Sequence, residues 1–341
     1  MLIILADDLT GALDSAAPFA ARGMTTLVAL SVADIPAALV RSPDVLSINL
    51  GSREVDAATA RELTATALAR VQDGALLFKK VDSRLKGNIG AELEAFAFRS
   101  ALVAPAIPEF GRVVRNGHVQ GFGVDKPIPV ADLIGAASSR AFIPDAITQA
   151  DMVRELAAGL ERGVDLLVGA RGLAEALAAH LKPETMAAAA PVPAGPALFV
   201  IGSRDPITLA QIERLQNTCS PRFLPAPNGV VSAGGAHDAA LTLVQALPGE
   251  IELGGEEVSR QLASSVHPHL TGAAKVLLLS GGATAEAVLQ KMGVKLLELK
   301  GECLPGLALA YSNRHCIIAK SGGFGGEDTL SIVAQKTMRV E

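Results

Sequence analysis

The chain has 341 residues, a length that suggests two domains. Half of its residues are hydrophobic, only 3% are aromatic, and the formal net charge is −5. Few rings for base stacking and no excess of basic residues argue against a nucleic-acid partner. The spacing of Cys219, Cys303 and Cys316 suits neither a zinc site nor a disulfide framework. The first apolar run is too short for a signal or membrane segment, so we expect a cytoplasmic protein without a membrane partner.

The first predicted element is a strand at residues 2–6, buried on both faces because its apolar residues do not alternate with polar ones. It ends on Asp7 and Asp8, and a Thr-Gly step then opens an Ala-rich, helix-like segment that contains Pro18. Adjacent carboxylates at this position need a cation, a substrate hydroxyl or a metal as partner. The simpler alternative is that one aspartate caps the helix and the other is solvated.

Residues 1–105 alternate strand-like and helix-like segments, which predicts a parallel sheet with right-handed crossovers. The expected strands are 2–6, 25–30, 45–50, 75–78 and 102–104, and the clearest helical patterns are 56–71 and 88–100. Polar residues gather after these strands, at 51–53 and 80–88, and therefore at one edge of the sheet. There Arg53, Arg84 and Lys86 could meet an anionic ligand, although each could instead be a solvated surface charge. Asp7, Asp8 and Asp82 could meet its hydroxyl groups.

Residues 105–145 are rich in Pro and Gly with weak periodicity, and we interpret them as a flap beside the site. Helical patterns return at 151–159 and 173–181, on either side of a strand at 165–168. The segment 187–196 consists almost wholly of Ala and Pro and is interpreted as a linker.

The second half contains strands at 197–201, 275–279 and 316–319, each followed by a Gly- and Ser-containing turn that opens a helix. Glycine allows backbone N–H groups to approach a ligand closely, and helix N-termini favour negative charge, so these turns indicate a nucleotide or phosphoryl ligand. Lys320 adds a cation beside the most Gly-rich turn. The alternative is that the glycines only form tight bends.

Several common motifs are absent from the sequence: GxxxxGK[ST], a GxGxxG after the first strand of either half, HExxH and GxSxG. The pair His267 and His269 flanks Pro268 at an expected helix end, where capping is the simpler role.

The chain resembles the four-carbon acid sugar kinases in segments that span most of its length. The matching segments are 6–11, 80–90, 202–208, 280–284, 301–302, 305–306 and 320–328. The resemblance implies an N-terminal acid-sugar-binding domain, a C-terminal ATP-binding domain, and phosphorylation of threonate, erythronate or 3-oxo-tetronate with ATP and Mg²⁺. This chain departs from the family pattern at Arg84, Lys86, Ala283 and Gly326 and at the pair 204–205, and it is shorter around 105–150.

These observations predict an α/β protein of two domains, 1–190 for the acid sugar and 191–341 for the nucleotide. Each would have a mainly parallel sheet flanked by helices, and the active site would lie in the cleft between them. We expect an ATP-dependent kinase of carbohydrate metabolism that phosphorylates a hydroxyl of a four-carbon acid sugar. The alternatives are a non-catalytic or degenerate protein of the same architecture, such as a sensor, and a dehydrogenase or isomerase acting on a sugar phosphate. A homodimer remains open.

The expected site has three groups of residues, and its metal ligands stay unassigned. The expected catalytic residues are Asp8 and Asp82. The expected substrate-binding residues are Asp7, Arg53, Lys80, Arg84, Lys86 and Asn88. The expected nucleotide-binding residues are Gly202, Ser203, Ser280, Gly281, Gly282, Thr284, Gly301, Glu302, Lys320, Ser321, Gly322, Gly323 and Gly325.

Overall fold

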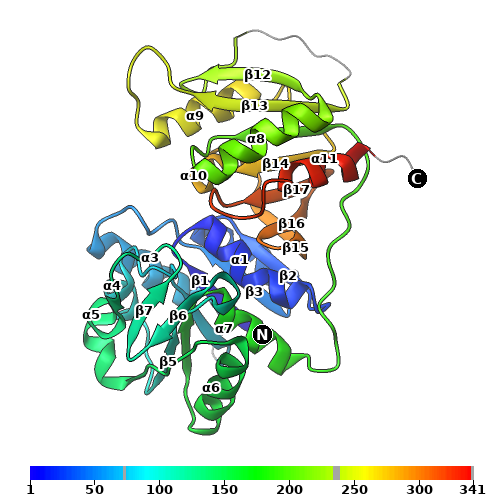
Figure 1. The fold of residues 1–341 in the computed structure, drawn as a ribbon. Coiled ribbons are helices and arrows are strands. Elements are labelled where there is room, and N and C mark those ends of the chain that lie inside the picture. The colour runs from blue at the N-terminus through cyan, green and yellow to red at the C-terminus, as the bar shows by residue number, and fades with distance from the viewer. Residues whose placement is uncertain (72–73, 233–238, 339–341) are drawn as a thin grey trace. The chain divides into compact units, whose positions relative to one another are not determined.

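The structure is a computed structural model that describes residues 1–71, 74–232 and 239–338. The chain divides into two compact units, which we call the N-terminal unit (Met1–Ala188) and the C-terminal unit (Ala189–Glu341) (Figure 1). Both units are α/β, with helices packed on a mostly parallel sheet. Within the described ranges, no helix has the length and apolar character needed to span a membrane.

The sheet of the N-terminal unit has the strand order β2-β3-β1-β4-β10-β5-β9, and every neighbouring pair in it is parallel. Its strands are β1 (Leu2–Ala6), β2 (Thr26–Ala29), β3 (Val45–Asn49), β4 (Leu76–Lys80), β5 (Ala101–Ala104), β9 (Ala141–Phe142) and β10 (Leu166–Gly169). Its helices are α1 (Leu9–Ala20), α2 (Ile35–Leu39), α3 (Ala57–Leu68), α4 (Ile89–Leu93), α5 (Val130–Ile134), α6 (Gln149–Glu161) and α7 (Arg171–Leu181). The unbroken apolar runs of β1 and β5 are wholly buried, as expected for central parallel strands.

Two predictions about helices need comment. Helix α1 contains Pro18 and continues to Ala20, so Pro18 does not end the helix, although it has no N–H to donate to the carbonyl four residues earlier. The helix expected over 88–100 was too long, since α4 covers only Ile89–Leu93. The apolar residues that follow α4, including Phe96 and Phe98, are buried without helical structure, which explains why their spacing was misleading.

The segment 105–145, interpreted from the sequence as a flap, contains a small antiparallel sheet in the order β6-β7-β8. The strands are β6 (Arg112–Arg115), β7 (His118–Gly121) and β8 (Ile128–Pro129). Strands of two to four residues are too short to give a detectable alternating pattern, and glycines at positive φ, such as Gly117 (71°) and Gly121 (99°), shape their turns. The sequence pattern therefore did not predict this sheet.

The sheet of the C-terminal unit has the order β12-β13-β11-β14-β17-β16-β15, with the first five strands parallel and the last two antiparallel to their neighbours. Its strands are β11 (Ala197–Ile201), β12 (Arg222–Pro227), β13 (Leu241–Leu247), β14 (Val276–Ser280), β15 (Leu296–Leu304), β16 (Leu307–Ser312) and β17 (His315–Lys320). Its helices are α8 (Pro206–Cys219), α9 (Gly255–Val266), α10 (Gly282–Lys291) and α11 (Thr329–Met338). The three predicted strands correspond to β11, β14 and β17, whereas the other four strands were not predicted.

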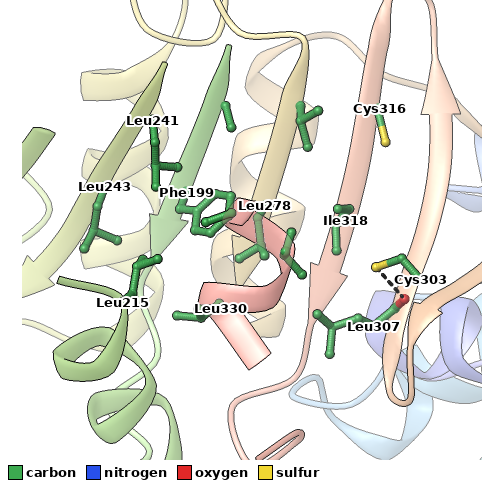
Figure 2. Close-up of a cluster of buried hydrophobic side chains, with 14 of the residues drawn as sticks. Phe199, Leu215, Leu241, Leu243, Leu278, Cys303, Leu307, Cys316, Ile318 and Leu330 are labelled. Carbon is green, nitrogen blue, oxygen red and sulfur yellow. Dashed lines mark hydrogen bonds between the residues drawn. The ribbon is translucent and has the colours of Figure 1, made fainter. Parts of the chain in front are cut away.

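Helices α8 and α11 cover one face of this sheet and enclose its core (Figure 2). Leu215 from α8 and Leu330 from α11 pack towards Phe199, Leu278 and Ile318 on the strands. The buried thiols complete this core. Burial raises the pKa of both Cys303 and Cys316 to about 12, so both are neutral, and all three cysteines are free.

Candidate active site

The carboxyl ends of β1, β3 and β4 lie side by side, so the polar residues that follow them converge. Ala6, the last residue of β1, is paired with Asn49 of β3 and with Lys80 of β4. The backbone N–H groups of Ser52 and Arg53 both donate to the carbonyl oxygen of Asp7, at 2.9 and 3.2 Å. The sequence prediction that these segments meet at one sheet edge is confirmed.

Asp7 and Asp8 are bridged by a single guanidinium, that of Arg53. Arg53 Nε and Nη2 donate to the two carboxylate oxygens of Asp7 at 2.7 and 2.9 Å, and Nη1 donates to Asp8 Oδ2 at 2.5 Å. Burial acts to raise the pKa of Asp7, but the positive charges of Lys79, Arg53 and Lys80 outweigh it and lower that pKa. Arg53 therefore holds the aspartates together, and the solvated alternative is wrong for Asp7, which is 3% exposed.

Asp8 is the N-cap of α1. Its Oδ1 accepts from the backbone N–H of Gly11 at 2.7 Å, and its Oδ2 accepts from Thr10 Oγ1 at 2.8 Å. The capping alternative is thus correct for Asp8, but its side chain also stays 21% exposed and accessible to a ligand. Asp8 serves as a cap and as a member of the charged cluster at once.

Lys80 places a buried ammonium group beside Asp8. A Cβ atom at Gly11 would lie 2.6 Å from Asp8 Oδ1 and 2.9 Å from Lys80 Nζ, so both atoms contact this glycine. Lys80 is 5% exposed. In the described parts of the chain, Lys80 Nζ has neither a carboxylate at ion-pair distance nor a hydrogen-bond acceptor. The charge of Lys80 acts on Asp7 and Asp14 without a direct ion pair among the described residues, so its ammonium can still donate to an anionic or hydroxylated ligand.

The loop from Asp82 to Asn88 closes over these groups. Asp82 Oδ1 accepts from the backbone N–H of Arg84 at 2.9 Å, and Leu85 is buried with a φ of +57°. The side chains of Arg84 and Lys86 are exposed on either side of this anchor. A Cβ at Gly87 would lie 3.0 Å from Asp7 Oδ2, so this loop lies directly against Asp7.

The side-chain amide of Asn88 stabilises the turn after β3. Its Nδ2 donates to the carbonyl oxygens of Ser52 and Val55, at 3.0 and 2.8 Å. Both donor hydrogens are used on this turn, so only the side-chain oxygen remains for a ligand. Its contacts therefore position the turn that carries Arg53.

Sequence reasoning did not select several charged residues that the fold brings to the same edge. Lys79 and Glu92 form an ion pair of 2.9 Å, and both side chains are 0 to 1% exposed. Glu92 Oε1 also accepts from Ser52 Oγ at 2.5 Å, which ties α4 to the turn before Arg53. The other missed groups are Asp14, Arg171 and Glu175, joined by ion pairs, and Arg112, which contacts Ser83. An uninterrupted pair of lysines ending a buried strand, Lys79-Lys80, was the one available signal.

In the C-terminal unit, the three predicted glycine turns meet because β11, β14 and β17 are neighbours in that order. The backbone N–H of Gly202 donates to Ser280 O at 3.0 Å, and that of Gly281 donates to Lys320 O at 3.0 Å. A Cβ at Gly202 would lie 1.9 Å from Thr284 Oγ1, and one at Gly322 would lie 2.5 Å from Ser203 Oγ. These turns touch one another only because the residues are glycines.

Helix α10 begins where these turns meet, and no side chain of the described residues caps the backbone N–H groups of its first turn. Its N-cap is Gly281, at a φ of +103°, which supplies no capping side chain, and the first turn has no acidic residue. Ser280 Oγ is buried without a hydrogen-bond partner. An uncapped helix N-terminus beside an unsatisfied hydroxyl can accept phosphate oxygens. Gly282 and Thr284 lie in the same first turn.

Lys320 is not a free cation at these turns. Its Nζ donates to Thr208 Oγ1, Ser321 O and Gly322 O at 3.0 to 3.1 Å. Burial lowers its pKa from 10.5 to about 8, although the charge of Asp205 acts in the opposite direction. Its observed contacts hold the turn that contains Ser321, Gly322, Gly323 and Gly325.

Gly301 and Glu302 lie at the same end of the sheet, on β15. Gly301 has a φ of +112° where the β15–β16 ladder is irregular, and Glu302 accepts from the backbone N–H of Gly306 at 3.1 Å. A Cβ at Gly306 would lie 2.5 Å from the ring of Phe324, so this hairpin turn packs against the Gly-rich turn. Glu302 thus stabilises the hairpin turn that packs against the Gly-rich turn after β17.

Metal ligands are sparse in the described residues. Nowhere in them do three or more His, Cys, Asp or Glu side chains gather in a way that could hold a metal ion. His267 is the C-cap residue of α9, where its Nδ1 lies 2.8 Å from Thr271 Oγ1. The ligands of a divalent cation therefore stay unassigned.

Comparison with known proteins finds two domain models in the chain. Residues 2–133 match the model of a sugar-binding N-terminal domain, and residues 229–330 match that of a nucleotide-binding C-terminal domain. The chain belongs to the four-carbon acid sugar kinase family. It is similar over 96% of its length to D-threonate kinase of Cupriavidus necator (29% identity, 96% of that protein) and to 3-oxo-tetronate kinase of Burkholderia multivorans (28% identity, 95% of that protein).

The fold is also known from a solved structure. The Haemophilus influenzae protein HI1011 matches 99% of this chain, and 100% of its own chain is covered, with a TM-score of 0.71 and 19% identity. At this identity the likeness concerns the fold alone. The two chains therefore share their fold over nearly the full length of this chain.

Proposed function

We propose that this protein is an ATP-dependent kinase that phosphorylates a hydroxyl of a four-carbon acid sugar, of the D-threonate, erythronate or 3-oxo-tetronate class. The observation that carries the proposal is the full-length similarity to D-threonate and 3-oxo-tetronate kinases. The charged residues that follow β1, β3 and β4 suit an acid sugar. The glycine turns that follow β11, β14 and β17 suit a nucleotide.

On the sugar side, Asp8 would accept the hydrogen of the attacking hydroxyl. Its carboxylate is 21% exposed and is fixed by its cap and by Arg53. The unpaired ammonium of Lys80 beside it would stabilise negative charge that develops during transfer, which suits a reaction that depends on positioning and electrostatics. Asp82 is engaged with the backbone of its own loop, which makes it the weaker candidate for this role.

On the nucleotide side, phosphate oxygens would lie at the N-terminus of α10, against the backbone N–H groups of Gly282 and Thr284 and the hydroxyl of Ser280. Bound Mg²⁺ supplies charge neutralisation of the phosphates and would be held largely by them and by water.

An ADP-release assay on purified full-length protein tests this function. D-threonate, L-threonate, D-erythronate and a 3-oxo-tetronate would each be supplied with ATP and Mg²⁺, with ATP alone as the control. We expect acid-dependent ADP release and a phosphorylated C4 acid detectable by mass spectrometry. ADP release that is equal with and without every acid would refute kinase activity on this class and favour a non-catalytic or degenerate protein.

A further inference from the structure

Arg112, on β6 of the small antiparallel sheet, reaches the loop that carries Arg84. Its Nη1 donates to Ser83 Oγ at 2.6 Å, and its Nε and Nη2 donate to the carbonyl oxygen of Phe122 at 3.0 and 2.9 Å. Both acceptors are neutral. Among the residues that the structure describes, no carboxylate lies at ion-pair distance from this guanidinium. Arg112 is thus held in place by neutral acceptors, and within the described ranges its charge has no direct ion pair.

Arg84 brings a second positive charge to the same place. Arg84 is exposed. Burial lowers the pKa of Arg112, and the positive charge of Arg84 lowers that pKa further. The two positive charges repel, the carboxylate of Asp82 offsets this repulsion only in part, and a bound anion would reduce what remains. The buried side chain of Leu85 keeps the loop, and with it Arg84, at this position.

The loop that carries Arg84 also reaches the Asp7–Arg53 cluster. A Cβ at Gly87, in the same loop, would lie 3.0 Å from Asp7 Oδ2 and 3.8 Å from Arg53 Cγ. The charge of Arg53 is already compensated, since its Nε, Nη1 and Nη2 donate to the carboxylates of Asp7 and Asp8. Arg112 uses the same three nitrogens on neutral acceptors, so its charge stays available, and its remaining N–H groups can donate to a carboxylate.

We propose that Arg112 and Arg84 form the subsite for the substrate's carboxylate, with its hydroxyl end towards Asp8 and Lys80. The inference rests on the proposed function in its choice of a four-carbon acid as ligand. Arg112, a residue of the 105–145 segment, would then distinguish an acid sugar from the uncharged polyol of the same length.

Isothermal titration calorimetry without ATP tests this subsite on the full-length protein. The probes are D-threonate, L-threonate and D-erythronate, and the variants are Arg112→Gln and Arg84→Gln. Arg115→Gln is the matched control, because Arg115 lies on the same strand at an odd offset from Arg112 and is exposed. We expect Arg112→Gln to weaken the best-binding acid about 10- to 100-fold, the loss typical of a hydrogen-bonded charge, and Arg115→Gln to change it less than about twofold.

A second arm measures threitol binding by ligand-observed NMR, where Arg112→Gln should have no effect. Equal acid affinity in the wild type and Arg112→Gln, or an equal loss in Arg115→Gln, would overturn the proposal, as would a wild type that binds none of the acids. If Arg112→Gln does not fold, the exposed Arg84→Gln decides by the same acid-specific loss. Acid binding that depends on Arg112, without any ADP release, would refute the kinase function and leave this subsite supported.

Discussion

The buried pair of Lys79 and Glu92 gives the sharpest prediction about how the fold supports the site. Both side chains are 0 to 1% exposed and their charged atoms lie 2.9 Å apart, although the approach does not align as a hydrogen bond. Removing one partner of a buried pair leaves an uncompensated charge, which costs about 3–5 kcal/mol. Glu92→Gln should therefore lower the free energy of unfolding by about that amount.

Glu92 has a second contact that raises this cost. Its Oε1 accepts from Ser52 Oγ, and weakening that bond adds about 1 kcal/mol. The total is a large fraction of the 5–15 kcal/mol that a typical domain has available. The double variant Lys79→Met, Glu92→Gln removes both charges, so it should be more stable than Glu92→Gln alone.

The assay is urea unfolding followed by far-ultraviolet circular dichroism. Glu94→Gln is the matched control, because Glu94 lies two residues away and forms an exposed pair with Arg61, with the side chains 56% and 58% exposed. Exposed pairs contribute about 0–1 kcal/mol, so this variant should unfold almost as the wild type does. A loss below about 1 kcal/mol in Glu92→Gln, or no recovery in the double variant, would refute the reasoning.

Three further predictions concern the two sites. Asp8→Asn keeps a capping side chain on α1, so it should preserve the unfolding midpoint while lowering kcat at least about 100-fold in the ADP-release assay; an unchanged kcat would remove Asp8 from the mechanism. Gly202→Ala places a Cβ 1.9 Å from Thr284 Oγ1 and should weaken ATP binding at least about tenfold by calorimetry, whereas Gly254→Ala, with open space around it, should not; equal affinities would contradict the glycine junction as the nucleotide site. Folding lowers the pKa of Lys320 from 10.5 to about 8, so the unfolded chain binds more protons than the folded chain between these pH values. The unfolding free energy of the wild type, measured relative to Lys320→Met by denaturant titration, should therefore rise from pH 8 to 10.5. A difference that does not change with pH would count against a buried ammonium.

The sequence alone was sufficient for features that depend on local pattern. Unbroken apolar runs located β1, β11 and β14, and a strand that runs into a polar turn and a helix placed Asp7, Asp8 and the glycine turns at the carboxyl edges of parallel sheets. These predictions hold because burial on both faces and the geometry of parallel crossovers leave few alternatives.

Only the tertiary structure decided which charges are paired and which are free. Arg53 forms ion pairs with Asp7 and Asp8, and Lys320 donates to its own turn, while their expected contacts with a ligand stay predictions. Lys80 keeps an unpaired ammonium, and Arg112 enters the site from a small sheet with no readable periodicity. Pairing depends on distances between residues far apart in the chain, and residue type and spacing carry no record of those distances.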